Sequence, residues 1–152
     1  MHDDTSMTQQ CVRAVIIRND KLLTMERHKG GQHYFALLGG AIDPGESKEQ
    51  ALVRELQEEA NLTVERFRHV FTEDMGKPFG TQYIYLCEDP GGEPSLRPDS
   101  IEAELNARGE QSFELAWLPL TSLDKMPLMS PKMKAAIMSA VKNTFPDMPE
   151  LL

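Results

Sequence analysis

Hydrophobic residues in the first third of the chain occur in short runs that are rich in β-branched side chains, which is typical of β-strands. Residues 11–18 and 21–27 form two such runs, and the Asn-Asp pair between them predicts a tight hairpin turn. A third run covers residues 34–38 and stops at a pair of glycines. The sequence therefore predicts three short strands before residue 40.

The hydrophobic period changes to that of a helix after residue 47. Leu52 and Leu56 stand four residues apart with two alanines beside them, and charged residues occupy most other positions. Ser47, followed three places later by Gln50, predicts a capping box at the start of this helix. Asn61 after the last apolar position predicts a left-handed helix end. We therefore expect a helix over residues 48–60.

The rest of the chain continues with predicted strands at residues 62–72, 81–88 and 113–118. Residues 89–112 are polar and rich in Pro, Gly and Glu, which predicts a long loop. A Ser-Pro pair at residues 130–131 predicts a helix that runs to about residue 142. Strands before and between two helices indicate an α+β domain.

Composition and charge narrow the class of protein. The 152 residues are 40% hydrophobic and 26% charged, which fits one soluble globular domain. Acids outnumber bases by 24 to 16, so the net charge of −8 argues against a nucleic-acid polymer as partner. The two cysteines lie in apolar runs, which argues against a disulfide framework. No apolar run is long enough for a membrane span, and the polar start does not resemble a secretory signal, so we expect a cytoplasmic protein.

Acidic residues concentrate on and just before the helix expected at residues 48–60. Glu55, Glu58 and Glu59 stand at positions i, i+3 and i+4, which places them on one helical face. Glu46 can reach the same region if the glycine-containing loop before the helix folds back. Divalent cations with oxygen ligands would offset the repulsion among these charges, and such cations could bridge to a polyanionic substrate.

Two other interpretations of the acidic segment are weighed against a metal site. A solvated acidic helix face is the usual meaning of such a charge run. A phosphate-binding Walker A loop is disfavoured, because Glu46 stands where that motif requires a lysine.

The segment from residue 40 to 62 resembles the Nudix box, G-x5-E-x7-R-E-U-x-E-E-x-G-U, in which U is a bulky apolar residue. The matching positions are Gly40, Glu46, Arg54, Glu55, Leu56, Glu58, Glu59 and Leu62. Asn61 replaces the second glycine of the box, and Leu38 stands where a proline is common. The resemblance implies the Nudix fold, an α/β/α sandwich around a central mixed sheet. It also implies hydrolysis of a nucleoside diphosphate linked to a moiety X.

The resemblance also implies roles for single residues. The residues that look like ligands of Mg²⁺, or of Mn²⁺ in its place, are Glu55, Glu58, Glu59 and the backbone carbonyl of Gly40. Arg54 is similar to the family arginine that orients a box carboxylate, and the supporting residues are Glu46, Gly39 and Gly45. Some family members use a further Glu outside the box as a ligand or base, for which the candidates are Glu102, Glu104, Glu110 and Glu114. Glu110 is favoured because it shortly precedes Trp117 in the long loop.

The expected protein is thus a single Nudix-type hydrolase domain over residues 11–143. Residues 1–10 are expected to be a flexible N-terminus, and residues 144–152 a C-terminal tail. The protein would act on a small nucleotide as a monomer or homodimer. The alternatives are a catalytically silent module that binds a nucleotide or a protein, and an acidic-helix scaffold, which does not explain the glycines. Aromatic residues that could stack a base, although core packing is favoured for most, are Tyr34, Phe35, Phe79, Tyr83 and Tyr85. Histidines without metal-ligand spacing, for which a solvated or structural role is favoured, are His2, His28, His33 and His69.

Overall fold

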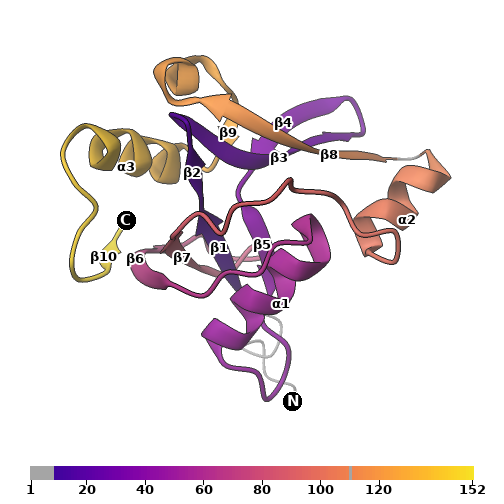
Figure 1. Cartoon of the computed structure of the whole chain (residues 1–152), viewed down its shortest axis with the longest axis horizontal. Coiled ribbons are helices and arrows are strands. Elements are labelled where there is room, and N and C mark those ends of the chain that lie inside the picture. The colour runs from indigo at the N-terminus through magenta and orange to yellow at the C-terminus, as the bar shows by residue number, and fades with distance from the viewer. Residues whose placement is uncertain (1–8, 110) are drawn as a thin grey trace.

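The computed structural model of the protein describes residues 9–109 and 111–152 as two mixed β-sheets with three α-helices (Figure 1). The first sheet has the strand order β10 (Glu150–Leu151), β6 (Phe67–Asp74), β7 (Thr81–Cys87), β1 (Gln10–Val15) and β5 (Leu38–Ala41). Strand β1 is parallel to β7 and antiparallel to β5. Gly40 of the box and the preceding Gly39 therefore lie on an edge strand of this sheet.

The second sheet has the strand order β2 (Ile17–Arg18), β3 (Lys21–Lys29), β4 (Gln32–Ala36) and β9 (Leu128–Met129), and β8 (Gln111–Pro119) also pairs with β3. Asn19 and Asp20 join β2 to β3 with φ of 51° and 61°. Such left-handed backbone at both central positions suits a tight hairpin turn, which confirms the turn predicted from the sequence.

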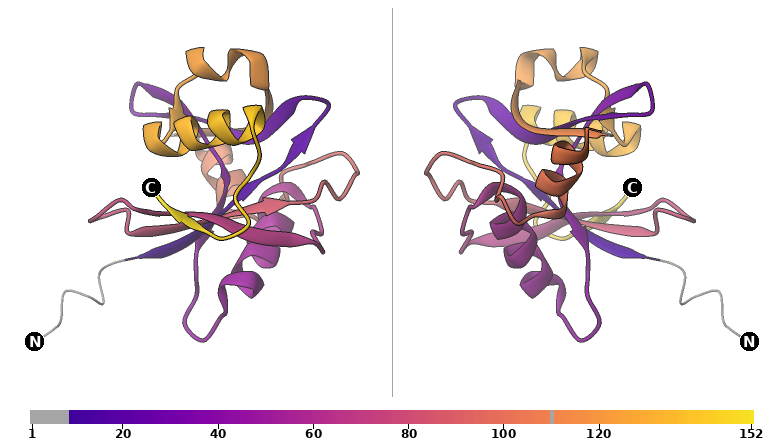
Figure 2. Two further views of the ribbon diagram at one scale, coloured as in Figure 1. Left: turned by 90° about the vertical axis from the view of Figure 1, so that its left-hand side faces the viewer. Right: turned by 90° about the vertical axis from the view of Figure 1, so that its right-hand side faces the viewer.

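Helices α1 (Lys48–Ala60) and α3 (Pro131–Lys142) cover opposite faces of the first sheet (Figure 2). Leu52 and Leu56 of α1 pack in one core cluster with Val12 of β1, whereas Ile137 of α3 packs in a second cluster with Val15. Side chains of β1 point alternately to the two faces, so one strand serves both clusters. The predicted α+β class is confirmed, with the strands divided between two mixed sheets.

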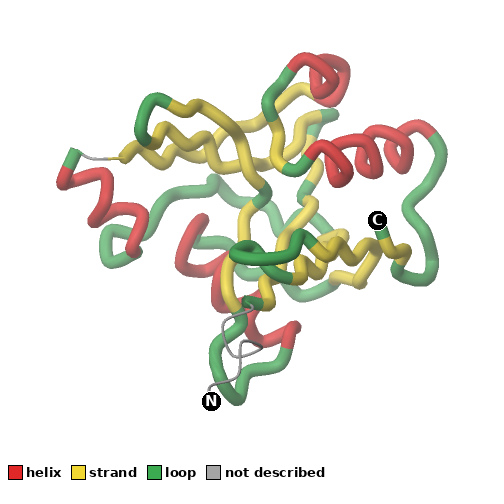
Figure 3. The backbone as a smooth tube through the Cα atoms, turned by 180° about the vertical axis from the view of Figure 1, so that it is seen from behind, coloured by secondary structure: helices red, strands yellow, loops and turns green. Residues whose placement is uncertain are grey.

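Helix α2 (Ile101–Arg108) lies beside β8, and a 3₁₀ helix, η2 (Leu120–Lys125), follows that strand. Figure 3 shows α2 and α3 on opposite sides of the molecule, with the C-terminal strand returning to the first sheet. Among the described residues, no helix is long and apolar enough to cross a membrane.

Both ends of α1 form as the sequence predicts. The Ser47 hydroxyl accepts a hydrogen bond from the Gln50 N–H at 3.0 Å, and the Gln50 side chain accepts one from the Ser47 N–H at 2.9 Å. Asn61 ends the helix in the left-handed conformation, with φ of 54° and ψ of 39°. Helix α3 likewise begins after Ser130, whose side chain caps the N–H of Met133.

Two predicted strands have different bounds in the structure. The predicted strand 62–72 begins only at Phe67, because Leu62 and Val64 are apolar for packing against α1 and not for strand pairing. The run 34–38 divides at Leu37 between β4 and β5, which belong to different sheets.

The expected loop 89–112 contains α2, which the sequence analysis missed. Ser100 caps its start and Gly109, with φ of 75°, ends it. None of its residues is buried, so no apolar stripe of helical period was present to reveal it.

The helix end at Asn61 provides a test of local stability. We expect Asn61→Gly to change the free energy of unfolding by less than ~1 kcal/mol, because both residues adopt left-handed backbone readily. Asn61→Val should lower it by about 1–2 kcal/mol, since a β-branched residue is strained there. Urea unfolding of the two variants measures the difference, and equal stabilities would contradict this account of the helix end.

Candidate metal and catalytic site

The acidic residues of α1 meet the two glycines of β5 because the loop between them, which contains Gly45, folds back onto the helix. Gly40 lies directly against the Glu55 carboxylate, and a Cβ added at Gly40 would come within 2.6–2.7 Å of its atoms. A Cβ added at Gly39 would collide with the backbone of Val12. Both positions therefore require glycine for close approach, one to a neighbouring strand and one to a carboxylate.

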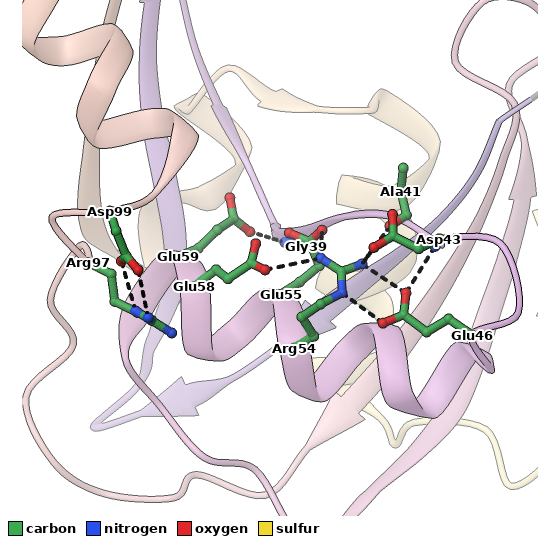
Figure 4. A network of polar contacts seen from close by, with 10 residues as sticks. All are labelled: Gly39, Ala41, Asp43, Glu46, Arg54, Glu55, Glu58, Glu59, Arg97 and Asp99. Carbon is green, nitrogen blue, oxygen red and sulfur yellow. Dashed lines mark hydrogen bonds and ion pairs between the residues drawn. The ribbon is translucent and has the colours of Figure 1, made fainter.

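Arg54 is the centre of a network that holds the acidic residues in place (Figure 4). Its Nε and Nη2 donate to the two carboxylate oxygens of Glu46 at 2.7 and 2.9 Å. Its Nη1 donates to Glu55 at 2.9 Å and lies 3.4 Å from Glu58, and Nη2 also donates to the Ala41 carbonyl. Glu46, which was expected to support the site, thus does so by binding Arg54. A bidentate pair of this kind fixes orientation more firmly than a single contact does.

Opposite charges within the network shift the pKa values of its members. The Arg54 guanidinium and the Asp43 N–H hold the pKa of Glu46 at about 2, so this carboxylate stays charged. The pKa of Arg54 is raised in turn, chiefly by its hydrogen bond to Glu46. Asp43 adds a further contact to Arg54 at 3.5 Å, which the sequence analysis did not anticipate. Glu46 therefore acts as the anchor of Arg54.

Glu59 is the most deeply buried acid on this face, with 6% of its surface exposed. Its Oε1 accepts a hydrogen bond from the Gly39 N–H at 2.6 Å. Burial, with the nearby charge of Glu102, raises its pKa to about 8, although the Gly39 N–H and Arg13 act in the opposite direction. A nearby cation would favour the charged form of this carboxylate.

Glu55 and Glu58 are more accessible than Glu59. The Glu55 side chain is 13% exposed and the Glu58 side chain is 42% exposed. Burial raises the pKa of Glu55, and the charges of Glu58 and Glu102 act in the same direction. The three helix acids thus form a graded set, from a buried carboxylate to one that faces solvent.

These residues fit a hard divalent cation. The set contains only oxygen donors, which is what Mg²⁺ and Mn²⁺ prefer. The glycine at position 40 lets the Glu55 carboxylate lie directly against the main chain of β5. Repulsion among the acids is only partly balanced by Arg54, and a cation would balance the remainder.

The candidates for an acid outside the box have different surroundings. The charge of Glu102 on α2 contributes to the raised pKa values of both Glu55 and Glu59. Glu104 is exposed and pairs with Arg108 at 2.7 Å, whereas Glu114 lies on β8 opposite Glu26. Glu110, which the sequence analysis favoured, lies outside the described residues. Among these candidates in the described part of the chain, Glu102 is the one whose charge contributes to the raised pKa values of Glu55 and Glu59.

A cavity of about 900 Å³ is lined by Arg13 together with residues of β3, β4 and the start of α3. Arg13 lines it, pairs in register with Gly39 and influences the ionisation of Glu59, which connects the cavity to the acids. Its lining also includes cationic and aromatic side chains, namely Arg27, Lys29, Tyr34 and Phe79. A space of this size and chemistry can hold an anionic ligand with an aromatic ring. Phe35 and Tyr85, from the aromatic set for which core packing was mostly favoured over stacking, are buried in the core.

Comparison with known proteins assigns the family. The family model for the NUDIX domain matches residues 7–139. The chain belongs to the Nudix family. Nudix enzymes typically use a divalent metal ion and act on nucleotide-type substrates.

The relatives of this Nudix chain include the NAD-capped RNA hydrolase NudC of Yersinia enterocolitica, 34% identical over 111 residues, which are 72% of this chain and 41% of NudC. The Escherichia coli O1:K1 protein of the same name is 30% identical over the same shares. The matched region thus spans about two fifths of those relatives.

Solved structures share the Nudix fold. The E. coli ORF135 protein has a TM-score of 0.65 at 24% identity, with 90% of this chain and 94% of that one covered. An ADP-ribose pyrophosphatase of Streptococcus suis has a TM-score of 0.66 at 23% identity, covering 95% and 98%. The fold expected from the box is therefore confirmed.

Proposed function

We propose that this Nudix domain is a Mg²⁺-dependent pyrophosphohydrolase that cleaves a nucleoside diphosphate linked to a moiety X. The observation that carries the proposal is the Arg54 network, which holds Glu46 and Glu55 on the same helix as the buried Glu59. A merely solvated acidic helix has no need for a bidentate arginine or for a buried carboxylate hydrogen-bonded to a glycine N–H.

Glu55, Glu58 and Glu59, with the Gly40 carbonyl, are the residues that would hold Mg²⁺, and Mn²⁺ could replace it. When bound, the ion lowers the pKa of a water molecule and neutralises charge on the phosphates. Arg54 keeps Glu55 in one orientation, and Glu46 keeps Arg54 in place. Preorganisation of this kind means that the carboxylates need no rearrangement as the substrate reacts.

Glu102 is the residue we propose as general base. It approaches the helix acids from α2, a separate element, and so can remove a proton from the attacking water without giving up a metal-ligand role. The electron pair of the water forms the new P–O bond, and the phosphoanhydride P–O bond breaks. The products are two phosphate esters, one carrying the nucleoside and one carrying X.

The cavity lined by Arg13 is the proposed site for the organic part of the substrate. Arg13, Arg27 and Lys29 supply positive charge in a chain whose net charge is −8, and Tyr34 and Phe79 supply aromatic faces. Phe79 is 57% exposed, which leaves its ring available to a base. The names of the relatives, NAD-capped RNA hydrolase and ADP-ribose pyrophosphatase, support testing dinucleotides, capped RNA and nucleoside diphosphate sugars first.

A panel of nucleotides assayed with Mg²⁺ and with EDTA tests the proposed activity. We expect at least one nucleoside diphosphate derivative to be hydrolysed with Mg²⁺ or Mn²⁺, and chelation to abolish the reaction, because the acids cannot activate water unaided. Product analysis by mass spectrometry would identify X. Full activity in EDTA would contradict the mechanism, and nucleotide binding without hydrolysis would favour a silent binding module.

A further inference from the structure

A second group of metal-ligating side chains lies on the β3–β4 hairpin. His28 of β3 stands directly opposite His33 of β4 in the antiparallel register, and Glu26 precedes His28 by two residues on the same face. One ligand atom from each of these three side chains lies within 4.8 Å of the others. His28 and His33 are five residues apart, which is not a metal-binding spacing in the linear sequence. The pairing of β3 with β4 in the hairpin brings the two side chains together.

The three side chains already lie close to one another. The His33 Nε2 lies 2.6 Å from a Glu26 carboxylate oxygen, and the two imidazole rings stack with centroids 4.3 Å apart. Ligand atoms around a tetrahedral zinc ion are about 3.3 Å apart, given bonds of about 2.0 Å. Because the His33 side chain is 45% exposed and that of Glu26 is 26% exposed, small side-chain rotations can bring the atoms to that spacing.

This cluster is separate from the acids of the Nudix box. It lies on the second sheet, and in Figure 1 the β3–β4 hairpin lies above the first sheet whereas α1 lies below it. The donor set also differs, because two imidazoles and one carboxylate favour zinc, whereas an all-oxygen set favours magnesium. A cavity of about 600 Å³ lined by His28, His33 and Glu114 gives access from solvent.

We propose that Glu26, His28 and His33 form a binding site for one Zn²⁺ ion that is distinct from the catalytic metal site. Three protein ligands leave a fourth position for water or for Glu114, which stands opposite Glu26 on β8. The ion would join β3 to β4 next to the hairpin turn. Arg27 and Tyr34 of the same hairpin line the large cavity, so zinc would stiffen one wall of the proposed substrate site.

Zinc binding can be measured without any assay of hydrolysis. The full chain, freed of metal and held at about pH 7.5, is titrated with zinc chloride in a large excess of Mg²⁺ that occupies the box acids. We expect one Zn²⁺ per chain by calorimetry and a rise in melting temperature. Co²⁺ in place of zinc should give the intense visible absorption of a four-coordinate site.

Single variants then assign the ligands. His28→Ala, His33→Ala and Glu26→Gln should each weaken zinc binding at least ~10-fold, because each removes one of three ligands. His69→Gln is the matched control, since His69 bonds to Phe71 and Thr72 on the other sheet and should leave zinc affinity unchanged. Circular dichroism of the metal-free variants checks folding. No zinc binding by the wild type, or equal affinity in all four variants, would overturn the proposal.

Discussion

Replacing Glu59 with glutamine is expected to lower kcat in Mg²⁺ at least ~100-fold and to raise the melting temperature of the metal-free protein. The loss of rate follows because the charge on a metal ligand contributes several kcal/mol to stabilisation of the transition state through the ion it holds. The gain in stability follows because glutamine can still accept the Gly39 hydrogen bond but carries no buried charge.

The stability difference should depend on pH in a defined direction. The pKa of Glu59 is raised from 4.5 to about 8 by folding, so the folded state binds the proton more tightly than the unfolded state. This contribution to stability is fully present below about pH 4.5 and is lost as pH rises through about 8. Thermal unfolding in EDTA should therefore show the advantage of Glu59→Gln over the wild type increasing between about pH 5 and pH 8.

Two further substitutions on α1 separate a catalytic role from a general effect of charge. Glu58→Gln should also lower kcat at least ~100-fold, although its exposed side chain makes any gain in stability smaller. Glu49→Gln is the matched control, because Glu49 accepts a hydrogen bond from Tyr85 and folding lowers its pKa. This control should keep its activity and should not gain stability. An unaltered kcat in both Glu58→Gln and Glu59→Gln would defeat the catalytic assignment.

The local structure around α1 could be predicted from the sequence because it depends on residues close together in the chain. The Ser47–Gln50 capping box, the left-handed Asn61 and the face shared by Glu55, Glu58 and Glu59 all follow from spacing within about 15 residues. The family resemblance placed Gly40 beside these acids, and the structure gives the reason, which is contact with the Glu55 carboxylate.

Features that depend on distant parts of the chain could not be predicted. Arg13 and Glu102 influence the same buried carboxylate from β1 and α2, and no pattern in the sequence relates positions so far apart. Helix α2 has no buried residue, so hydrophobic periodicity did not reveal it. His28 and His33 become neighbours only through the β3–β4 register, which is why they were not predicted as possible metal ligands.

Glu102→Gln is expected to lower kcat by about 10²- to 10⁴-fold, the range usual for loss of a general base. The proposal depends on Glu102 facing Glu55 and Glu59 from α2, where it can remove a proton while the helix acids hold the ion. Because the substitution removes a proton acceptor and not a ligand, the Mg²⁺ concentration for half-maximal rate should change little. A large increase in that concentration would instead make Glu102 a metal ligand.

Glu110→Gln and Glu104→Gln complete this test. The sequence favoured Glu110 as the acid outside the box, so a loss of ~10²-fold in Glu110→Gln with a near-wild-type rate in Glu102→Gln would restore that assignment. Glu104 lies two residues after Glu102 on the same helix and pairs with Arg108 at the surface, so Glu104→Gln is a control for helix stability and net charge. We expect its kcat to stay within about twofold of the wild type, because an exposed pair contributes little. If Glu102→Gln and Glu104→Gln lose activity equally, the effect belongs to α2 as a whole and Glu102 is not the base.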